Sequence, residues 1–144
     1  MLTYTPALPE DVEQIFLLNK ALIDEYEDVD TVDYDKVLLW VHRSIEKNLP
    51  FFTRVLSDGT LAGFYCLMPS DGALELDSLF VLPEFRGSGI GTQILKKCQA
   101  CSPALFLYVF RRNVRAVALY ERLGFRVIKA AGNTRYIMKY ERQE

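Results

Sequence analysis

A glycine-rich segment at residues 86–91, with the sequence Arg-Gly-Ser-Gly-Ile-Gly, is the feature of the chain best suited to carry chemistry. It follows a strand-like apolar run and opens a helical pattern, so unpaired N–H groups and the positive end of a helix dipole meet there. Such a junction binds phosphate, and Arg86 adds a positive charge. The alternative is a turn that needs glycine only for its backbone conformation. Three glycines within five residues favour phosphate binding.

Two common nucleotide-binding motifs do not fit this segment. A P-loop requires a lysine directly after its last glycine, and here the first lysine after Gly91 is Lys96. The dinucleotide motif reads Gly-x-Gly-x-x-Gly after an early strand of a parallel sheet, whereas this segment reads Gly-x-Gly-x-Gly after consecutive antiparallel strands. The glycine-rich segment therefore belongs to neither of these two nucleotide-binding folds.

Two carboxylates precede the glycine segment on the same expected strand. Glu75 and Asp77 are two residues apart, so their side chains point to the same face of a sheet. A carboxylate held near a reacting group can serve as a general base. The alternative is an ordinary solvated strand face.

The three cysteines, Cys66, Cys98 and Cys101, are too few and odd in number for a disulfide framework. Cys98 and Cys101 have the spacing of half a zinc site, but the only histidine, His42, is far away in the sequence. We therefore expect structural thiols and no metal site, and a redox role for Cys98 and Cys101 stays undecided.

The spacing of apolar residues predicts the elements that must position these groups, in the order βααβββαβαββ. Helices are expected at residues 9–26, 33–47, from the glycine segment to about 100, and 113–123, and strands at 2–6, 51–56, 61–68, 73–81, 104–110, 125–129 and 136–140. Turn signals at 57–59 and 69–72 make the three strands after the second helix antiparallel. The apolar run at 104–110 is typical of a strand covered on both faces. Together these patterns predict a mixed α/β (α+β) fold, with a mainly antiparallel central sheet flanked by helices.

Length and composition narrow the class of protein. The 144 residues are 50% hydrophobic and 25% charged, which favours a single domain over residues 1–144 and excludes a disordered polymer. The sequence contains no apolar run of about 18 residues, so no membrane span is predicted. The N-terminus lacks the pattern of a secretory signal, so a cytoplasmic location is expected. Residues 1–83 contain 5 Lys+Arg and 15 Asp+Glu, whereas residues 84–144 contain 12 Lys+Arg and 4 Asp+Glu. The acidic first half therefore favours a cationic partner and the basic second half an anionic one.

Residues 79–91 and 113–125 together resemble the two acetyl-coenzyme A motifs of the GNAT N-acetyltransferases. The first motif has the pattern Arg/Gln-x-x-Gly-x-Gly/Ala, matched by Arg86, Gly89 and Gly91. The second places an asparagine, an alanine and a tyrosine on one helix before Gly-Phe, as residues 113–125 do. The pair is more specific than either motif alone, and the predicted element order agrees with the fold of that family.

The resemblance implies transfer of an acetyl group from acetyl-coenzyme A to an amine, with coenzyme A as the product. The cofactor-binding residues it implies are Leu79, Phe80, Val81, Arg86, Gly87, Ser88, Gly89, Ile90, Gly91, Thr92 and Asn113. The pantetheine arm would pair with the backbone of the strand that ends at Val81, where an N–H group would also polarise the thioester carbonyl.

The same resemblance assigns the acid and suggests the base. Tyr120 holds the general-acid position that protonates the leaving thiolate, although a purely packing role is the alternative. An alkylamine has a pKa of about 10.4, so it must lose a proton before it attacks. Glu75 falls where the histone-acetylating branch carries its base, which favours it over Asp77, and a water relay stays an alternative. The branch that acetylates protein N-termini often has a glutamate five residues before the motif asparagine, where this chain has Tyr108.

An acidic segment between the first two helices points to the acceptor. It carries seven carboxylates without a lysine or arginine among them: Asp24, Glu25, Glu27, Asp28, Asp30, Asp33 and Asp35. In the resembling fold this segment flanks the acceptor entrance, so Asp28 and Asp30 are expected to bind a cationic small amine or a lysine-rich peptide. The alternative is a solvated surface that aids solubility or pairs with the basic half.

The sequence also allows two other functions. The fold could retain acyl-coenzyme A as a sensor or interaction module without turnover. A nucleic-acid binder is disfavoured, because the chain is negative overall and its arginines at 111, 112, 115, 122 and 126 lie outside any helix-turn-helix pattern. We expect an amine substrate and neither nucleic acid nor membrane as partner. The resemblance suggests a homodimer formed through exposed strands, whereas the sequence does not identify the amine.

Overall fold

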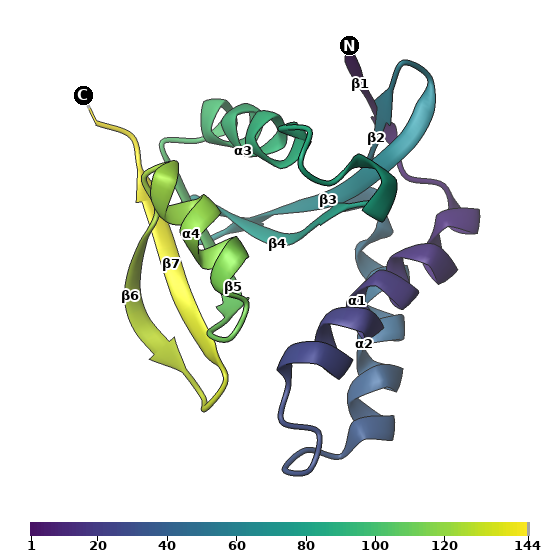
Figure 1. Cartoon of the computed structure of the whole chain (residues 1–144), viewed down its shortest axis with the longest axis vertical. Coiled ribbons are helices and arrows are strands. Elements are labelled where there is room, and N and C mark those ends of the chain that lie inside the picture. Colours follow the sequence, from purple (N-terminus) through teal and green to yellow (C-terminus); the bar gives the residue numbers. More distant parts are fainter. Residues whose placement is uncertain (144) are drawn as a thin grey trace.

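The computed structural model describes residues 1–143, and its strands form one sheet in the order β1-β2-β3-β4-β5-β7-β6 (Figure 1). The strands are β1 (Leu2–Pro6), β2 (Phe52–Ser57), β3 (Thr60–Ser70), β4 (Ala73–Val81), β5 (Ala104–Phe110), β6 (Arg126–Ala131) and β7 (Arg135–Glu141). The helices are α1 (Val12–Tyr26), α2 (Tyr34–Asn48), α3 (Ile90–Cys101) and α4 (Val114–Arg122), with short 3₁₀ turns at Pro9–Asp11, Leu49–Phe51 and Pro83–Phe85. Only β4 and β5 pair in parallel. The predicted element order and the mainly antiparallel sheet are confirmed.

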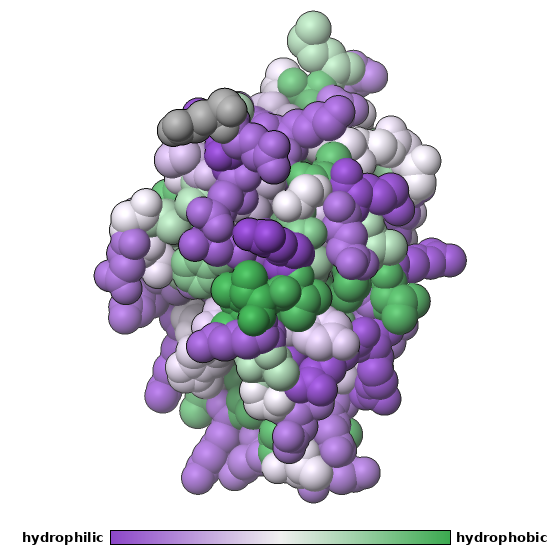
Figure 2. Space-filling model, turned by 90° about the vertical axis from the view of Figure 1, so that its left-hand side faces the viewer, coloured by the Kyte–Doolittle hydropathy of each residue, from purple (hydrophilic) through white to green (hydrophobic). Residues whose placement is uncertain are grey.

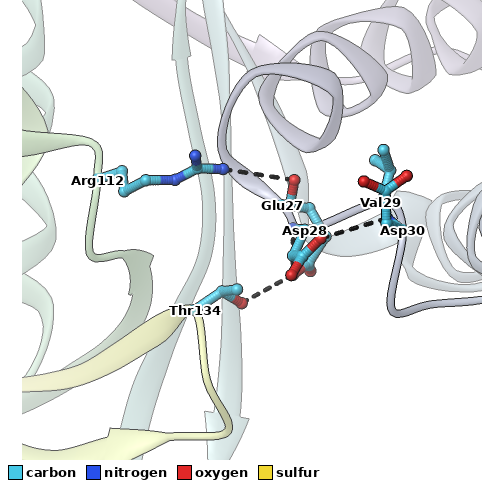
Figure 3. Close-up of a pocket in the computed structure, with 6 residues that line it drawn as sticks. All are labelled: Glu27, Asp28, Val29, Asp30, Arg112 and Thr134. Carbon is cyan, nitrogen blue, oxygen red and sulfur yellow. Dashed lines mark hydrogen bonds between the residues drawn. The ribbon is translucent and has the colours of Figure 1, made fainter.

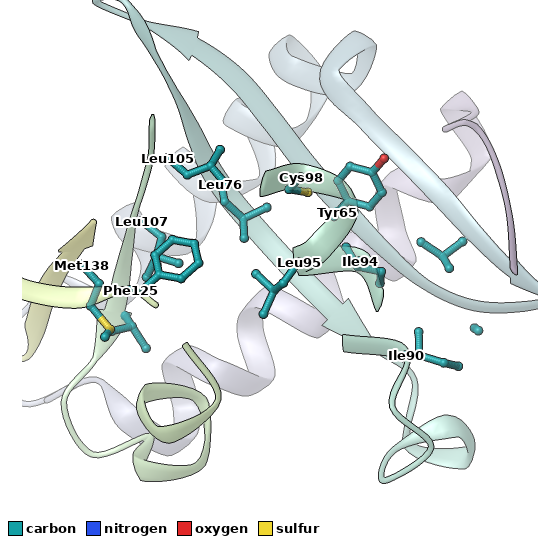
Figure 4. Close-up of a cluster of buried hydrophobic side chains, with 13 residues drawn as sticks. Tyr65, Leu76, Ile90, Ile94, Leu95, Cys98, Leu105, Leu107, Phe125 and Met138 are labelled. Carbon is teal, nitrogen blue, oxygen red and sulfur yellow. The ribbon is translucent and has the colours of Figure 1, made fainter. Parts of the chain in front are cut away.

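Helices cover both faces of the sheet. On one face α1 and α2 bury Ile15 and Ile45 against Phe64 and Phe80. On the other face α3 and α4 cover a larger cluster, drawn in Figure 4. The apolar side predicted for α3 is buried there, through Ile90, Ile94, Leu95 and Cys98. Within residues 1–143 no helix is long and apolar enough to cross a membrane.

Side-chain caps define where two of these helices begin. The Asp33 carboxylate accepts a hydrogen bond from the Lys36 N–H at 3.3 Å, and the Asn113 side chain accepts one from the Ala116 N–H at 3.3 Å. Each such cap stabilises a helix by about 1 kcal/mol. After α4, Gly124 takes a left-handed conformation with φ of 93°, which ends the helix as predicted.

Two details differ from the sequence predictions. The turn expected at residues 69–72 is shorter, because β3 runs through Ser70 and the reversal needs only Asp71 and Gly72, both with positive φ. The expectation that β5 is covered on both faces is wrong at Tyr108, which is 49% exposed. On that face α1 and α2 cover the neighbouring strands but do not extend over Tyr108.

The sheet has an exposed edge at β6. Val127 and Ile128 are exposed there, and Figure 2, which views the β6 side, shows hydrophobic surface among hydrophilic side chains. The pairing of β6 with β7 shifts register between Val127 and Lys129. Such irregularities, with charges like Arg126 and Lys129, limit edge-to-edge pairing between copies. Homodimer formation stays a prediction.

A histidine joins the two helices on the α1–α2 face. His42 of α2 places Nε2 2.6 Å from an oxygen of Glu13 in α1 and Nδ1 3.0 Å from an oxygen of Glu46 in α2. The hydrogen bond to Glu13, followed by that to Glu46, raises the pKa of His42 above 6.5. The doubly protonated ring can donate to both carboxylates at once.

This arrangement predicts a pH-dependent contribution to stability. Because the folded pKa of His42 is raised, its contribution is complete below about pH 6.5 and is lost as the pH rises through the folded value. The melting temperature of the parent should therefore exceed that of His42→Gln most at acidic pH and approach it in alkaline buffer. Thermal unfolding of both proteins across the range would show this. A difference that does not change with pH would contradict it.

Candidate active site

The glycine segment forms the junction between β4 and α3. Gly87 and Gly89 have φ of 80° and 83°, and Gly89 is the residue at which α3 begins. A Cβ atom at either glycine would meet no atom within 4 Å, so both glycines serve the backbone conformation and leave the space beside the loop free. The first helical hydrogen bond runs from the Gln93 N–H to the Gly89 carbonyl. The N–H groups at the start of α3 can therefore donate to an anion.

The other members of the segment stabilise this loop. The Arg86 guanidinium donates from Nε to the Val81 carbonyl at 3.2 Å, and the Ser88 hydroxyl donates to the Phe85 carbonyl. Arg86 thus stays beside the end of β4 with its remaining N–H groups available. A Cβ atom at Gly91 would lie 3.5 Å from Leu119 of α4, an ordinary contact distance, so the packing of α3 against α4 does not itself require glycine there.

The parallel strands β4 and β5 separate next to this loop. They pair only at Leu74 with Leu105 and at Glu75 with Phe106, and then diverge (Figure 1). The rest of β4, to Val81, has no strand on its β5 side. Backbone N–H and carbonyl groups on that side need another partner, and an extended ligand can supply it. Leu79 and Val81 direct their side chains to the α3 cluster and Phe80 to the α1–α2 cluster, so only their backbone groups can contact such a ligand.

Tyr120 lies on α4, which flanks this opening. Its ring packs on Phe125 with a centroid distance of 5.7 Å. Burial of the hydroxyl is the main cause that raises the pKa of Tyr120 to about 12. The hydroxyl therefore keeps its proton at neutral pH, as a general acid must. Packing and proton donation are compatible in one residue, as the sequence suggested.

Glu75 and Asp77 lie on β4 where the strands begin to separate. Cys66 of β3 pairs with Ser78 and Leu67 with Leu76, so Asp77 has no partner and forms a β-bulge. Burial, followed by the charge of Asp77, raises the pKa of Glu75, and burial raises that of Asp77 although its side chain reaches solvent. The Ser78 hydroxyl donates to Asp77 at 3.3 Å, which opposes the shift. A carboxylate with a raised pKa is a stronger base than an ordinary one.

Asn113, Ile90 and Thr92 are the remaining residues predicted for the cofactor. Asn113 caps α4 through its side chain, which uses one acceptor of the amide. Ile90 is buried, so only its backbone N–H faces the loop, and Thr92 lies in the first turn of α3. The structure thus brings the predicted cofactor residues to one end of β4 and to the starts of two helices.

The end of α1 is attached to the opposite half of the sheet. Glu27 is 10% exposed, accepts a hydrogen bond from the Thr134 hydroxyl at 2.8 Å and lies 3.4 Å from Arg135. Arg112 donates to the Tyr26 carbonyl at 2.8 Å, and the Tyr26 ring stacks on Phe110 at 6.1 Å. No local sequence signal indicated these contacts, because the hydrogen-bonded partners are 86 and 107 residues apart.

A hollow of about 490 Å³ lies beside this attachment (Figure 3). The residues that line it are Glu27, Asp28, Val29, Asp30, Arg112 and Thr134. The Asp30 N–H donates to the Asp28 carboxylate at 3.3 Å, which fixes the turn after α1. The predicted acceptor residues Asp28 and Asp30 thus share one depression.

The acidic segment is less negative than its sequence suggests. Asp24 pairs with Lys20 at 2.8 Å, Glu27 with Arg135 at 3.4 Å, and Asp33 with Lys36 at 3.8 Å. A count of charges within the segment leaves out these cations, and the pair of Glu27 with Arg135 agrees with the alternative in which the segment pairs with the basic half. Asp28 and Asp30 are exposed and add their charges to the field at the hollow.

The cysteines have no metal or disulfide partners among residues 1–143, all three being free thiols. Cys66 and Cys98 are buried, which raises the pKa of the Cys66 thiol and raises that of Cys98 to about 12. Cys101 is exposed at the end of α3. Buried thiols with raised pKa values react slowly, which favours a structural role for Cys66 and Cys98.

A split between parallel strands, a helix start whose N–H groups can bind phosphate and a tyrosine with a raised pKa thus occur together around one opening. The model of the acetyltransferase (GNAT) family matches residues 16–125, and the chain belongs to this family.

Relatives and solved structures extend this finding. The chain is 26% identical over 118 residues to the peptidyl-lysine N-acetyltransferase YjaB of Escherichia coli (strain K12), covering 82% of this chain and 78% of the relative. It is 31% identical over 86 residues to the spermine/spermidine N(1)-acetyltransferase of Bacillus subtilis (strain 168), covering 47% and 54%. The PaiA N-acetyltransferase of Thermoplasma acidophilum, solved in complex with coenzyme A, has the same fold, with a TM-score of 0.75 and 19% identity over 98% of this chain and 99% of that one.

Proposed function

We propose that this chain transfers the acetyl group of acetyl-coenzyme A to a primary amine on a cationic small molecule or a peptide. The similarity to relatives named for peptidyl-lysine and for spermine or spermidine supports this acceptor class. The three free thiols suit a reducing compartment such as the cytoplasm.

The separation of β4 from β5 beside the start of α3 carries the proposal. The pantetheine arm would pair with the backbone of Leu79–Val81, and the pyrophosphate would accept hydrogen bonds from the loop of residues 86–91. The free space beside Gly87 and Gly89 and the N–H groups of Arg86 fit such a ligand. The residues present therefore suit acetyl-coenzyme A.

The reaction would form a C–N bond and break the C–S bond of the thioester. Glu75 or Asp77 would take a proton from the ammonium group of the acceptor, directly or through a water molecule. A backbone N–H at the end of β4 would stabilise the developing oxyanion. Tyr120, whose hydroxyl is protonated at neutral pH, would donate its proton to the departing sulfur. The second proton that the nitrogen loses as the amide forms would restore the tyrosine hydroxyl.

The proposal is tested by measuring thiol release from acetyl-coenzyme A with a panel of amines. The panel contains spermidine, free amino acids, an aminoglycoside and lysine peptides. Amine-dependent release is expected, greater for spermidine and lysine peptides than for free amino acids. Tight binding of acetyl-coenzyme A in calorimetry without release for any amine would instead favour a sensor module.

Neutralising the hollow should weaken acceptor binding selectively. Asp28→Asn with Asp30→Asn removes two negative charges from the lining, so the acceptor KM should rise roughly 3- to 10-fold at low ionic strength. The KM for acetyl-coenzyme A should change little, and kcat/KM should depend less on salt. Steady-state kinetics at two salt concentrations would measure all three effects.

A matched control removes the same charge elsewhere. Glu10→Gln with Asp71→Asn alters two exposed carboxylates outside the hollow, and asparagine tolerates the positive φ of position 71. This pair should leave the acceptor KM close to that of the parent. Equal effects of the two double variants would show that Asp28 and Asp30 act only through net charge.

A further inference from the structure

The only tryptophan of the chain lies on the outer side of α2. Trp40 is 68% exposed and its neighbour Leu39 is 52% exposed. Large apolar side chains that project into water in this way often mark an interaction site when several lie together. Neither residue belongs to the acetyl-transfer site described above.

A third exposed apolar residue comes from α1. The contact of Glu13 with His42, and the position of Lys20 over the Tyr34 ring, set the antiparallel register of α1 and α2. Midway between these contacts Leu17 lies opposite the part of α2 that carries Leu39, and it is 59% exposed. Figure 1 shows α1 and α2 side by side, well away from β6. We call Leu17, Leu39 and Trp40 the α2 patch.

Basic side chains form one stripe through this patch. Lys36, Arg43 and Lys47 are exposed and, with Trp40, are spaced by four, three and four residues, which puts them on one side of the helix. They are three of the five lysines and arginines in residues 1–83, which are otherwise strongly acidic. Glu46 accepts a hydrogen bond from His42, and Asp35 lies at the start of α2 beside the stripe. The local surface is therefore apolar with a basic border.

We infer that the α2 patch binds an acidic and apolar segment of a protein acceptor, whose target lysine enters the hollow at Asp28 and Asp30. This inference rests on the proposed acetyl transfer. The stripe from Lys36 to Lys47 extends about 16 Å along the helix, which five extended residues cover. It begins at the residue after Asp35, where the acidic segment ends, so one peptide can reach both surfaces.

Charge distinguishes this occupant from others. A polyamine is repelled by Lys36, Arg43 and Lys47 and has no apolar side chain to cover Trp40. A nucleic acid or an anionic membrane would place a continuous row of phosphates next to Asp28, Asp30 and Asp35, which repel them. A protein segment can match opposite charges at the two places. The chain would thus favour lysines followed by acidic and apolar residues.

Trp40 itself reports binding, because its fluorescence is the only tryptophan signal of the protein. The probe is a peptide with one lysine followed by alternating glutamate and leucine, compared with a peptide that has lysine in place of each glutamate. The acidic peptide should shift the emission to shorter wavelength and have a KM about 10-fold lower. The double variant Lys36→Glu with Arg43→Glu should abolish both effects, whereas its KM for spermidine should stay the same or fall, because two charges that repel a polyamine are removed.

The control variant Lys96→Glu with Lys129→Glu reverses two exposed charges on α3 and β6 and should bind the acidic peptide as the parent does. Equal KM values for the two peptides would overturn the inference. So would a fluorescence shift caused by an RNA oligonucleotide or by anionic vesicles and not by the acidic peptide. An absence of transfer to every acceptor, with the fluorescence shift intact, would instead refute the proposed function.

Discussion

Replacing Tyr120 with phenylalanine should lower kcat by roughly 100-fold, the usual effect of losing a general acid. The departing thiolate would then take its proton from water, which is not held at the sulfur. Phenylalanine keeps the ring that packs on Phe125, so the melting temperature should change by only a few degrees. The KM for acetyl-coenzyme A should stay close to that of the parent. Steady-state kinetics and thermal unfolding of the same preparations would separate the two effects.

Tyr140 provides a control within the same aromatic cluster. Tyr140 lies on β7, and the centroid of its ring is 5.6 Å from that of Phe125. The change Tyr140→Phe therefore removes a comparable hydroxyl from a ring that packs on the same phenylalanine. Activity should be retained in this variant. If Tyr120→Phe and Tyr140→Phe had equal kcat values, Tyr120 would be a packing residue and not the acid.

Replacing Glu75, the carboxylate proposed as the base, should have an effect of similar size. We expect Glu75→Gln to lower kcat/KM by about 100-fold at pH 7 and Asp77→Asn to lower it less than 5-fold. Parent activity should rise with pH as the base loses its proton, through a value above 4.5, since burial and the charge of Asp77 raise the pKa of Glu75. The variant that removes the base should lose this rise. If Asp77→Asn were the more damaging change, Asp77 would be the base.

The pH dependence of protein stability gives an independent test of the raised pKa of Glu75. Because the folded pKa of Glu75 is raised, the native state binds more protons than the unfolded state and loses stability as the pH rises above 4.5. Glu75→Gln should therefore melt at a higher temperature than the parent at pH 7. Below about pH 4 the difference should disappear. A destabilised variant at pH 7 would show that the ionised carboxylate has favourable contacts that outweigh its burial.

Local patterns predicted most of the elements, because each depends on neighbours in the chain. The bounds of β1, β4 and β5 agree with the prediction, and those of α4 differ from it by one residue at each end. The glycine segment was predictable for the same reason. Its phosphate-binding geometry needs only a strand, positive φ values and a helix start.

The features that complete the site depend on distant parts of the chain. The split between β4 and β5 arises because β5 pairs along its whole length with β7, while β4 pairs with β3. The bulge at Asp77 depends on the register between β3 and β4, and the position of the Glu27 side chain depends on its partners in the β6–β7 hairpin. None of these partners is within reach of a local pattern. The sequence therefore predicted the family better than the shape of the site.

The central claim is that the opening between β4 and β5 holds acetyl-coenzyme A for transfer to an amine. The most direct measurement follows the acetyl carbon, labelled with ¹³C, from acetyl-coenzyme A to a lysine peptide by mass spectrometry while free thiol is counted. We predict one labelled acetyl-lysine for each thiol released, with both rates reduced together in Tyr120→Phe. Thiol release without labelled peptide, or labelled peptide formed at the same rate without the enzyme, would contradict the claim.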